Sequence, residues 1–169
     1  MIRSAQTSVR ANLLREGAAF VRAAAALPGV VRVAVIGSVT TDLAVPKDID
    51  FLVTVADDAD LVPLAAAARR LQGRAQSFGS GADVFLADPA GRYLGRTCPW
   101  RECGPGRRLS CDARHCGRRP YLHDDLDIVV LAPALIAEPP LDLHPAVLRR
   151  TTIPADLEAI ASGFDGGAQ

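Results

Sequence analysis

The sequence carries no net charge and no long uninterrupted apolar run. Its 19 Lys and Arg residues are balanced by 19 Asp and Glu residues, so the chain as a whole lacks the basic excess typical of nucleic-acid-binding proteins. Apolar stretches such as 18–35 are interrupted by Arg22, Pro28, Gly29 and Arg32, and the N-terminus lacks the compact apolar core of a signal peptide. We therefore expect a cytoplasmic protein with no membrane partner.

Lysine and cysteine are both scarce. Lys47 is the only lysine, and this preference for arginine, together with the high alanine content, is typical of a GC-rich genome and needs no functional cause. The four cysteines all fall between 98 and 116, where seven arginines lie within 96–119 against Glu102 and Asp112. Charge is thus unevenly distributed along a chain whose total is zero.

The chain does have enough apolar residues for one domain. Its 169 residues and 49% hydrophobic composition are ordinary for a single domain, 1–169. Helical spacing of apolar residues and short apolar runs bounded by Gly, Pro and Asp predict the elements. The expected order is helix 4–26, strand 30–36, strand 49–55, helix 60–71, strand 82–87, turn 88–91 and a returning strand 92–97. This order predicts an α/β (α+β) fold with a small mixed β-sheet flanked by helices.

The most informative motif lies between the first two predicted strands. The first strand ends at Gly37-Ser38, and the second opens with Asp48-Ile49-Asp50. Successive side chains of a strand point to opposite faces, so the two aspartates project from the same face, about 7 Å apart. Their repulsion is relieved by a divalent cation, and Mg²⁺ binds carboxylates together with substrate phosphates. Gly37 allows close approach of a ligand, and Ser38 offers a hydroxyl and an N–H to phosphate.

This combination resembles the signature of the polymerase-beta-like nucleotidyltransferase superfamily, in both order and spacing. The resemblance implies the nucleotidyltransferase fold and Mg²⁺-dependent transfer of an NMP from an NTP to an acceptor, with release of pyrophosphate. It implies that Gly37 and Ser38 bind the nucleotide, and that Asp48 and Asp50 are catalytic and hold Mg²⁺. The chain departs from minimal stand-alone members at 39–42, where it lacks the arginine directly after Gly-Ser and the glycine soon after it.

Members of this superfamily commonly carry a third catalytic carboxylate on the strand after the helix. Asp83 is the first choice, because a strand, helix, strand connection leaves the two strands parallel and their starts at one sheet edge. That edge already carries Asp48 and Asp50. Asp127 is the alternate, since it opens a fourth predicted strand, 126–131, that would start at the same edge.

The cysteine segment predicts a structural zinc ion. The four cysteines are separated by four, seven and four residues: Cys98, Cys103, Cys111 and Cys116. With few large apolar side chains, the segment 98–116 cannot build a core of its own, and four thiolates around Zn²⁺ supply that stability. His115 and His123 are alternates for one cysteine. Four ligands leave no open position for water, so we expect an inserted zinc knuckle with a structural role; two disulfides or four buried thiols are the competing interpretations.

The C-terminal part offers little for substrate selection. Two short helices are predicted at 145–150 and 154–161, followed by a glycine-rich end, 163–169, that we expect to be disordered. Larger relatives of the fold append a helical domain that grips the acceptor. Its absence predicts a helical partner subunit, a homodimer or an acceptor that is itself large.

Three functions are consistent with these patterns. The first is an active nucleotidyltransferase that uses an NTP to modify a small molecule, a protein or an RNA. The second is a catalytically degenerate module that keeps the fold and binds nucleotide. The third is a zinc-dependent RNA-binding protein in which the arginines of the cysteine segment contact phosphates and the carboxylates play no part.

Overall fold

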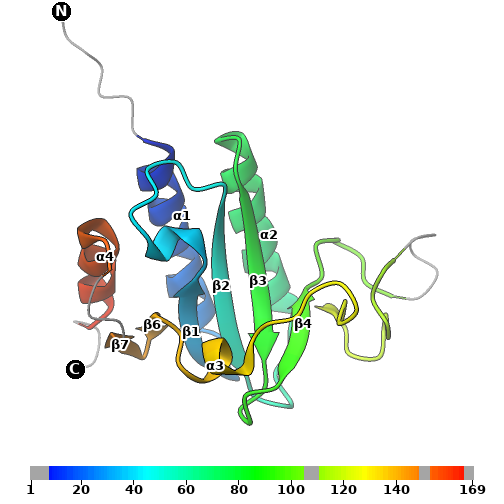
Figure 1. Cartoon of the computed structure of the whole chain (residues 1–169). Helices are drawn as coiled ribbons and strands as arrows, with labels where there is room; N and C mark the ends of the chain where they lie inside the picture. Colours follow the sequence, from blue (N-terminus) through cyan, green and yellow to red (C-terminus); the bar gives the residue numbers. More distant parts are fainter. Residues whose placement is uncertain (1–7, 105–110, 149–152, 166–169) are drawn as a thin grey trace, which may run out of the picture.

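The structure, a computed structural model of the chain, describes residues 8–104, 111–148 and 153–165. They form a mixed sheet with strand order β5-β4-β3-β2-β1-β6-β7, and helices lie on both of its faces (Figure 1). Along the chain the elements are α1 (Val9–Ala25), β1 (Val30–Ile36), η1 (Ser38–Thr40), β2 (Asp48–Val55), α2 (Val62–Ser77), β3 (Gly81–Ala87), β4 (Tyr93–Thr97), β5 (Leu122–His123), α3 (Pro133–Ala137), β6 (Leu141–His144), β7 (Ala146–Leu148) and α4 (Ala155–Asp165). The predicted mixed α+β architecture is confirmed.

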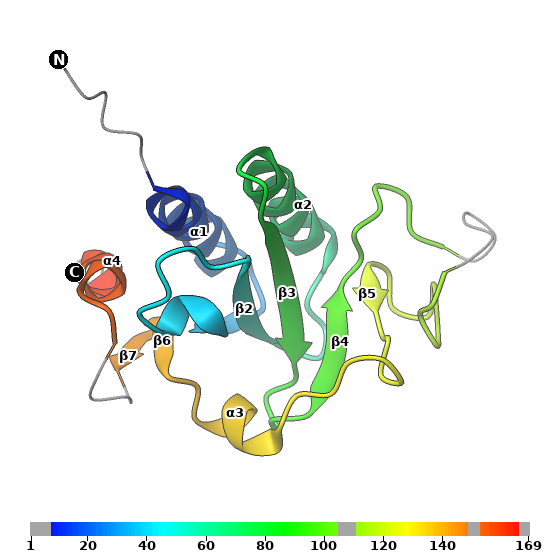
Figure 2. The ribbon, with the colours of Figure 1, turned by 45° about the horizontal axis from the view of Figure 1, so that its top comes forward.

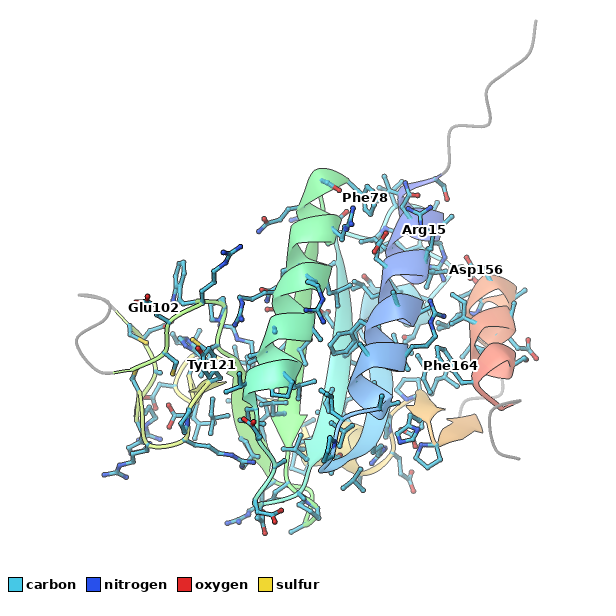
Figure 3. The ribbon with its side chains drawn as sticks, turned by 180° about the vertical axis from the view of Figure 1, so that it is seen from behind. Arg15, Phe78, Glu102, Tyr121, Asp156 and Phe164 are labelled. Carbon is cyan, nitrogen blue, oxygen red and sulfur yellow. The ribbon has the colours of Figure 1, made fainter. Side chains whose placement is uncertain are left out.

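Strands β2 and β3 are parallel neighbours, and the other adjacent strands pair antiparallel. The parallel pair is joined by α2, which packs beside α1 on one face of the sheet, while α3 lies on the other (Figure 2). Val39 of η1 belongs to the core on the side of α1 and α2. Seen from behind, α1 and α2 lie in front of the strands (Figure 3). The face opposite α1 and α2 is therefore the one on which short elements leave room for a site.

Apolar side chains separate into two clusters on the two faces of the sheet. Ile49 and Phe51 of β2 are each 1% exposed and belong to the main core with α1 and α2. Leu52, which points the other way, joins a smaller cluster that includes Ile136 of α3. Even-numbered residues of β2 therefore face away from α1 and α2, and the hydrophobic pattern fixes that orientation.

Arg10 connects α1 to the loop after β1. Its guanidinium is largely buried and donates hydrogen bonds to the carbonyls of Val39 at 2.9 Å and Leu43 at 3.1 Å. It also pairs with Asp156 of α4, with Nε 2.7 Å from Oδ2, and this hydrogen bond lowers the pKa of that carboxyl. One buried cation thus holds two helices and the loop that follows Gly37-Ser38 in a fixed arrangement.

The central predicted elements are present, with shifted ends. Helix α2 begins two residues after the predicted start and runs to Ser77, and the predicted strands 30–36, 49–55 and 82–87 match β1, β2 and β3 within one residue. The turn and the returning strand also form, as β4. Residues 4–7 of the first predicted helix lie outside the described residues. None of the helices in the described ranges is long and apolar enough to cross a membrane.

Two predictions near the C-terminus are wrong, and a third element ends later than predicted. Residues 126–131 form no strand, and Ile128 and Val130 are 63% and 82% exposed, because β5 is the strand that pairs with β4. Residues 146–148 form strand β7 against β6 in place of the helix predicted at 145–150. Helix α4 continues to Asp165, beyond the predicted end and into the tail expected from 163, and 166–169 lie outside the described residues.

Close packing of α1 on β2 makes Gly17 sensitive to size. A Cβ there would lie 2.6 Å from Ile49 Cδ1 and 3.0 Å from Phe51 Cζ. We expect Gly17→Val to lower the free energy of unfolding by about 1 to 3 kcal/mol, measured by urea denaturation. Gly73→Ala in α2, where a Cβ meets nothing within 4 Å, is the matched control and should stabilise by up to about 1 kcal/mol. A fully stable Gly17→Val variant would contradict this packing.

Candidate functional site

Three of the predicted carboxylates meet on one face of the sheet. Asp48 and Asp50 lie at the start of β2, and Asp83 lies in β3 directly opposite Asp50 in the parallel register. Opposed residues of neighbouring strands project from the same face, so all three point away from α1 and α2. The Asp48 carboxylate lies against Gly81, and a Cβ at position 81 would collide with it. The structure thus brings together Asp48, Asp50 and the first choice for the third carboxylate.

The Gly-Ser corner lies against the same carboxylates. Ile36 is the antiparallel partner of Asp50, so the chain turns at Gly37 immediately beside that side chain. Gly37 has φ +79°, and a Cβ there would lie 2.7 Å from Asp50 Oδ2. Only glycine combines this backbone conformation with this contact. Ser38 then opens η1, and the Thr40 hydroxyl donates to the Gly37 carbonyl at 2.7 Å, which holds the corner in place.

The charges of this site are not balanced. Burial, followed by the charges of Asp83 and Asp48, raises the pKa of Asp50 from 3.8 to about 7. Asp83 has a cationic partner, Arg96, but among the ion pairs of the described residues none involves Asp48 or Asp50. A cation that binds between these carboxylates would restore the ionised form of Asp50 and gain free energy by doing so.

Two charged residues that the sequence did not single out complete the site. Arg96 of β4 places Nη1 3.1 Å from Asp83 Oδ1 and donates from Nε to Asp125 Oδ2 at 2.9 Å. Asp125 is fully buried, and its Oδ1 has no hydrogen-bond partner within the described residues. Burial opposes the charge on Arg96, but the hydrogen bond and charge of Asp125 raise its pKa. The acidic residues just before 126 were the only sequence signal for Asp125. Its pairing with Arg96 depends on the β4–β5 register, which places Arg96 opposite His123.

Asp127, the alternate third carboxylate, lies elsewhere. Its side chain is 76% exposed and pairs with Arg114, with Oδ2 3.5 Å from Nε. The strand that would have carried it to the active edge does not form, so the structure does not bring it to Asp48 and Asp50.

None of the four predicted zinc ligands is in a disulfide, and no three of their thiols lie within 4.8 Å of one another in the part of the chain that the structure describes. Burial raises the pKa of the Cys98 thiol, and the nearby thiols of Cys103 and Cys111 add to the rise. Burial likewise raises the pKa of Cys116, with added contributions from Cys111 and Cys103. Each of these two thiols therefore lies near two of the others, which brings distant parts of the segment together.

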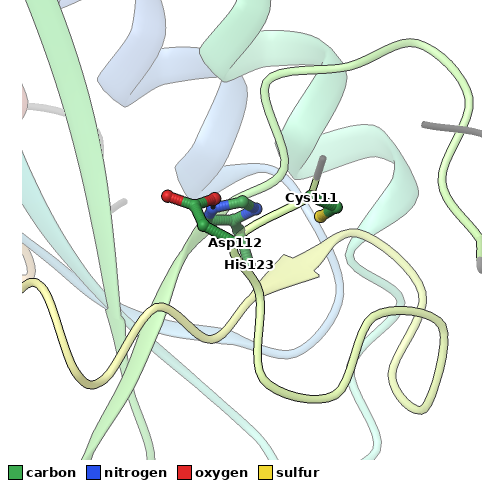
Figure 4. Close-up of side chains that lie close together, drawn as sticks. All are labelled: Cys111, Asp112 and His123. Atoms are coloured by element: carbon green, nitrogen blue, oxygen red, sulfur yellow. Dashed lines mark ion pairs between the residues drawn. The ribbon is translucent and has the colours of Figure 1, made fainter. Parts of the chain in front are cut away.

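Both alternate ligands lie within hydrogen-bond distance of carboxylates. His115 Nδ1 lies 2.7 Å from Asp124 Oδ2, and His123 Nε2 lies 2.6 Å from Asp112 Oδ1. Cys111, Asp112 and His123 place potential ligand atoms within 4.8 Å of one another, with the imidazole between the carboxylate and the thiol (Figure 4). His123 is 5% exposed, and its Nδ1 has no hydrogen-bond partner in the described part of the chain.

Comparisons with protein-family models, with curated proteins and with solved structures gave no match to this chain. Interpretation of the site therefore depends on its own geometry and charges.

The raised pKa of Asp50 predicts a pH-dependent effect of removing its charge. The folded state binds the proton more tightly than the unfolded state, so this group's stability contribution is present below pH 4 and is lost as the pH rises to about 7. We expect Asp50→Asn to raise the free energy of unfolding at pH 8 by up to about 4 kcal/mol, and hardly at all at pH 4. Urea unfolding without added divalent cations measures both.

The exposed carboxylate of Asp127 supplies the matched control. Asp127→Asn should change stability by less than about 0.5 kcal/mol at either pH. A gain for Asp50→Asn that is equal at pH 4 and pH 8 would contradict the electrostatic origin of the effect.

Proposed function

We propose that this chain is a Mg²⁺-dependent nucleotidyltransferase that moves an NMP from an NTP to an acceptor. The observation that carries the proposal is the meeting of Asp48, Asp50 and Asp83 on one sheet face, directly beside the Gly37-Ser38 corner. Carboxylates alone are common on surfaces. A half-buried pair of carboxylates without a cationic partner among the described residues, against a glycine corner that leaves room for a ligand, is a more specific arrangement.

The residues fit a divalent cation. Asp48 and Asp50 would hold it, because they share a face and have no cationic partner among the described residues. Burial, followed by the charges of Asp83 and Asp48, raises the pKa of Asp50 to about 7, so a cation there would offset an unfavourable negative charge. When bound, Mg²⁺ neutralises the charge on phosphate oxygens and aligns the attacking and leaving oxygens. Binding at this pair should therefore depend on pH and strengthen above about pH 7, where Asp50 no longer has to lose a proton.

The remaining residues of the site have separable roles in this proposal. Gly37 lets the triphosphate approach Asp50, since it presents no Cβ, and Ser38 offers its hydroxyl and N–H to a phosphate oxygen. Asp83 receives the proton of the acceptor as the acceptor oxygen bonds to the α-phosphorus and the bond to pyrophosphate breaks. Arg96 holds Asp83 in place through Oδ1.

Calorimetric titration with each NTP in the presence of Mg²⁺ tests the proposal. We expect Mg²⁺-dependent binding to the wild-type protein and a loss of at least about 100-fold in affinity or transfer for the Asp48→Asn, Asp50→Asn double variant. Asp127→Asn is the matched control, since it removes an equal charge from an exposed position.

Two other outcomes of this titration would have different meanings. Mg²⁺-dependent binding without any transferred product, across small-molecule, protein and RNA acceptors, would indicate a catalytically degenerate nucleotide-binding module. Absence of nucleotide binding to a folded wild-type protein would contradict the proposal outright.

A second candidate function, RNA binding, is favoured by a basic hollow. An open hollow of about 670 Å³ lies between α2 and the loop after β4, and it shares part of its wall with a neighbouring one of about 570 Å³. Arg70, Arg74 and Arg101 are exposed there and make no ion pair within the described residues. Arg70 and Arg74 line the smaller hollow, Trp100, which is 39% exposed, lines the larger one, and Arg101 lines both. Arginines beside an exposed indole bind phosphates and stack bases of a single strand.

The hollow continues toward the carboxylates. Gln72 and Pro99 line both the hollow and a small pocket whose wall includes Asp83 and Arg96. Arg69 links α2 to the loop after β4, because its Nη1 donates to the Trp100 carbonyl at 3.2 Å. An RNA held by the arginines would therefore have a path along which one end reaches Asp83.

Salt dependence of RNA affinity tests this second function. We expect the Arg70→Gln, Arg74→Gln, Arg101→Gln variant to bind a labelled single-stranded RNA more weakly in fluorescence anisotropy, with a log–log salt slope smaller by about 2. The paired variant Arg15→Gln, Arg22→Gln, on exposed positions of α1, is the control and should bind as the wild type does. An unchanged slope would show that these arginines do not contact phosphates.

A further inference from the structure

Three consecutive residues join the cysteine segment to the carboxylate site. His123 pairs through Nε2 with Asp112 at 2.6 Å, while the Asp124 carboxylate accepts a hydrogen bond from the backbone N–H of His115 at 2.9 Å and also pairs with that ring. The third residue, Asp125, holds Arg96 at the site. Two of the three side chains therefore face the cysteine segment, and the third faces the candidate active site.

The cysteine segment has little regular structure to hold it. Residues 98–104 and 111–121 contain no helix or strand, and Cys98 is the only buried apolar residue that they contribute to the described part of the chain. One hydrogen bond to sulfur supplements the few packing contacts: the Tyr121 N–H donates to Cys103 Sγ at 3.2 Å. Peptide N–H donors aimed at thiol sulfurs are the outer contacts that metal-bound thiolates use.

We propose that the thiols of Cys98, Cys103, Cys111 and Cys116 hold one zinc ion, and that this ion positions Asp83 through residues 123–125 and Arg96. Zn²⁺ is the metal that four sulfur ligands at such spacings favour, and a closed sphere of four thiolates is structural. The catalytic significance of the positioning rests on the proposed function; the zinc site itself does not.

His123 belongs next to this site as a neighbour of the ligands. The group Cys111, Asp112, His123 is compact, but it offers a single thiolate, and Asp112 is 54% exposed and already paired with the imidazole. Asp112 holds Nε2 of this buried histidine, and its Nδ1 has no hydrogen-bond partner within the described residues.

Native mass spectrometry of the purified full chain tests the ligand set. We expect one zinc per chain in the wild type, none in Cys103→Ser or Cys116→Ser, and one in His123→Gln. Asp112→Asn is the control for loss of the neighbouring ion pair and should also retain zinc. Loss of zinc from His123→Gln, or retention in both cysteine variants, would overturn the four-thiol site.

A second measurement needs no variant, which matters if the cysteine variants fail to fold. Cobalt(II) exchanged into the wild-type protein should give the tetrahedral absorption bands and intense sulfur charge-transfer bands of four thiolate ligands. An octahedral cobalt spectrum, or one with the weaker charge transfer of a single thiolate, would overturn the proposal.

Hydrogen exchange tests the connection to Asp83 without any nucleotide. After zinc is removed by a chelator, we expect faster exchange in β4 and at residues 122–125, with β1 and β2 still protected. Unchanged exchange at 122–125, or equal loss of protection in β1 and β2, would overturn the positioning role. These readouts decide the inference even if the chain proves not to bind an NTP, so its failure and that of the proposed function can be told apart.

Discussion

The parallel register of β2 and β3 is the constraint on which the candidate site depends. It places Asp50 directly opposite Asp83, and the sheet cannot relieve the repulsion by sliding, because a one-residue slip would turn every buried side chain of β2 to the other face. Burial of Ile49 and Phe51 contributes about 1.5 to 3 kcal/mol for each side chain. Together with the rest of the core, this outweighs a charge penalty of about 4 kcal/mol at Asp50. Core packing thus enforces an electrostatically costly arrangement, as functional sites often do.

Neutralisation within the site is one-sided. Arg96 lies between Asp83 and the buried Asp125, so that side of the site has its own cation. On the side of the Gly37 corner, Asp48 and Asp50 have no cationic partner among the described residues, and the glycine leaves space beside the Asp50 carboxylate. The carboxylates therefore differ in chemistry. Asp48 and Asp50 are suited to an incoming cation, whereas Asp83 is held in place by Arg96.

Local patterns predicted the centre of the fold and failed at the edges of the sheet. The alternation of 49–55 and the apolar runs at 30–36 and 82–87 predict strands correctly, because burial on a sheet face imposes its period on the chain itself. The apolar run at 126–131 has a similar pattern but no strand to pair with, because residues 122–123 occupy the position beside β4. At 146–148, pairing with β6 decided between helix and strand. Whether an edge strand forms depends on which other segment packs beside it, and the residues of the strand itself do not determine that.

The sequence by itself determined that Asp48 and Asp50 share a face and that a glycine corner precedes them, because side-chain direction along a strand is a property of neighbouring residues. Only the tertiary structure decided that Arg96 contacts both Asp83 and Asp125, the latter 29 positions after Arg96 in the chain. It also decided that Asp127 does not join the site. Those contacts follow from strand register and chain return. Register is set by the sum of packing over the whole sheet, so no short stretch of sequence contains it.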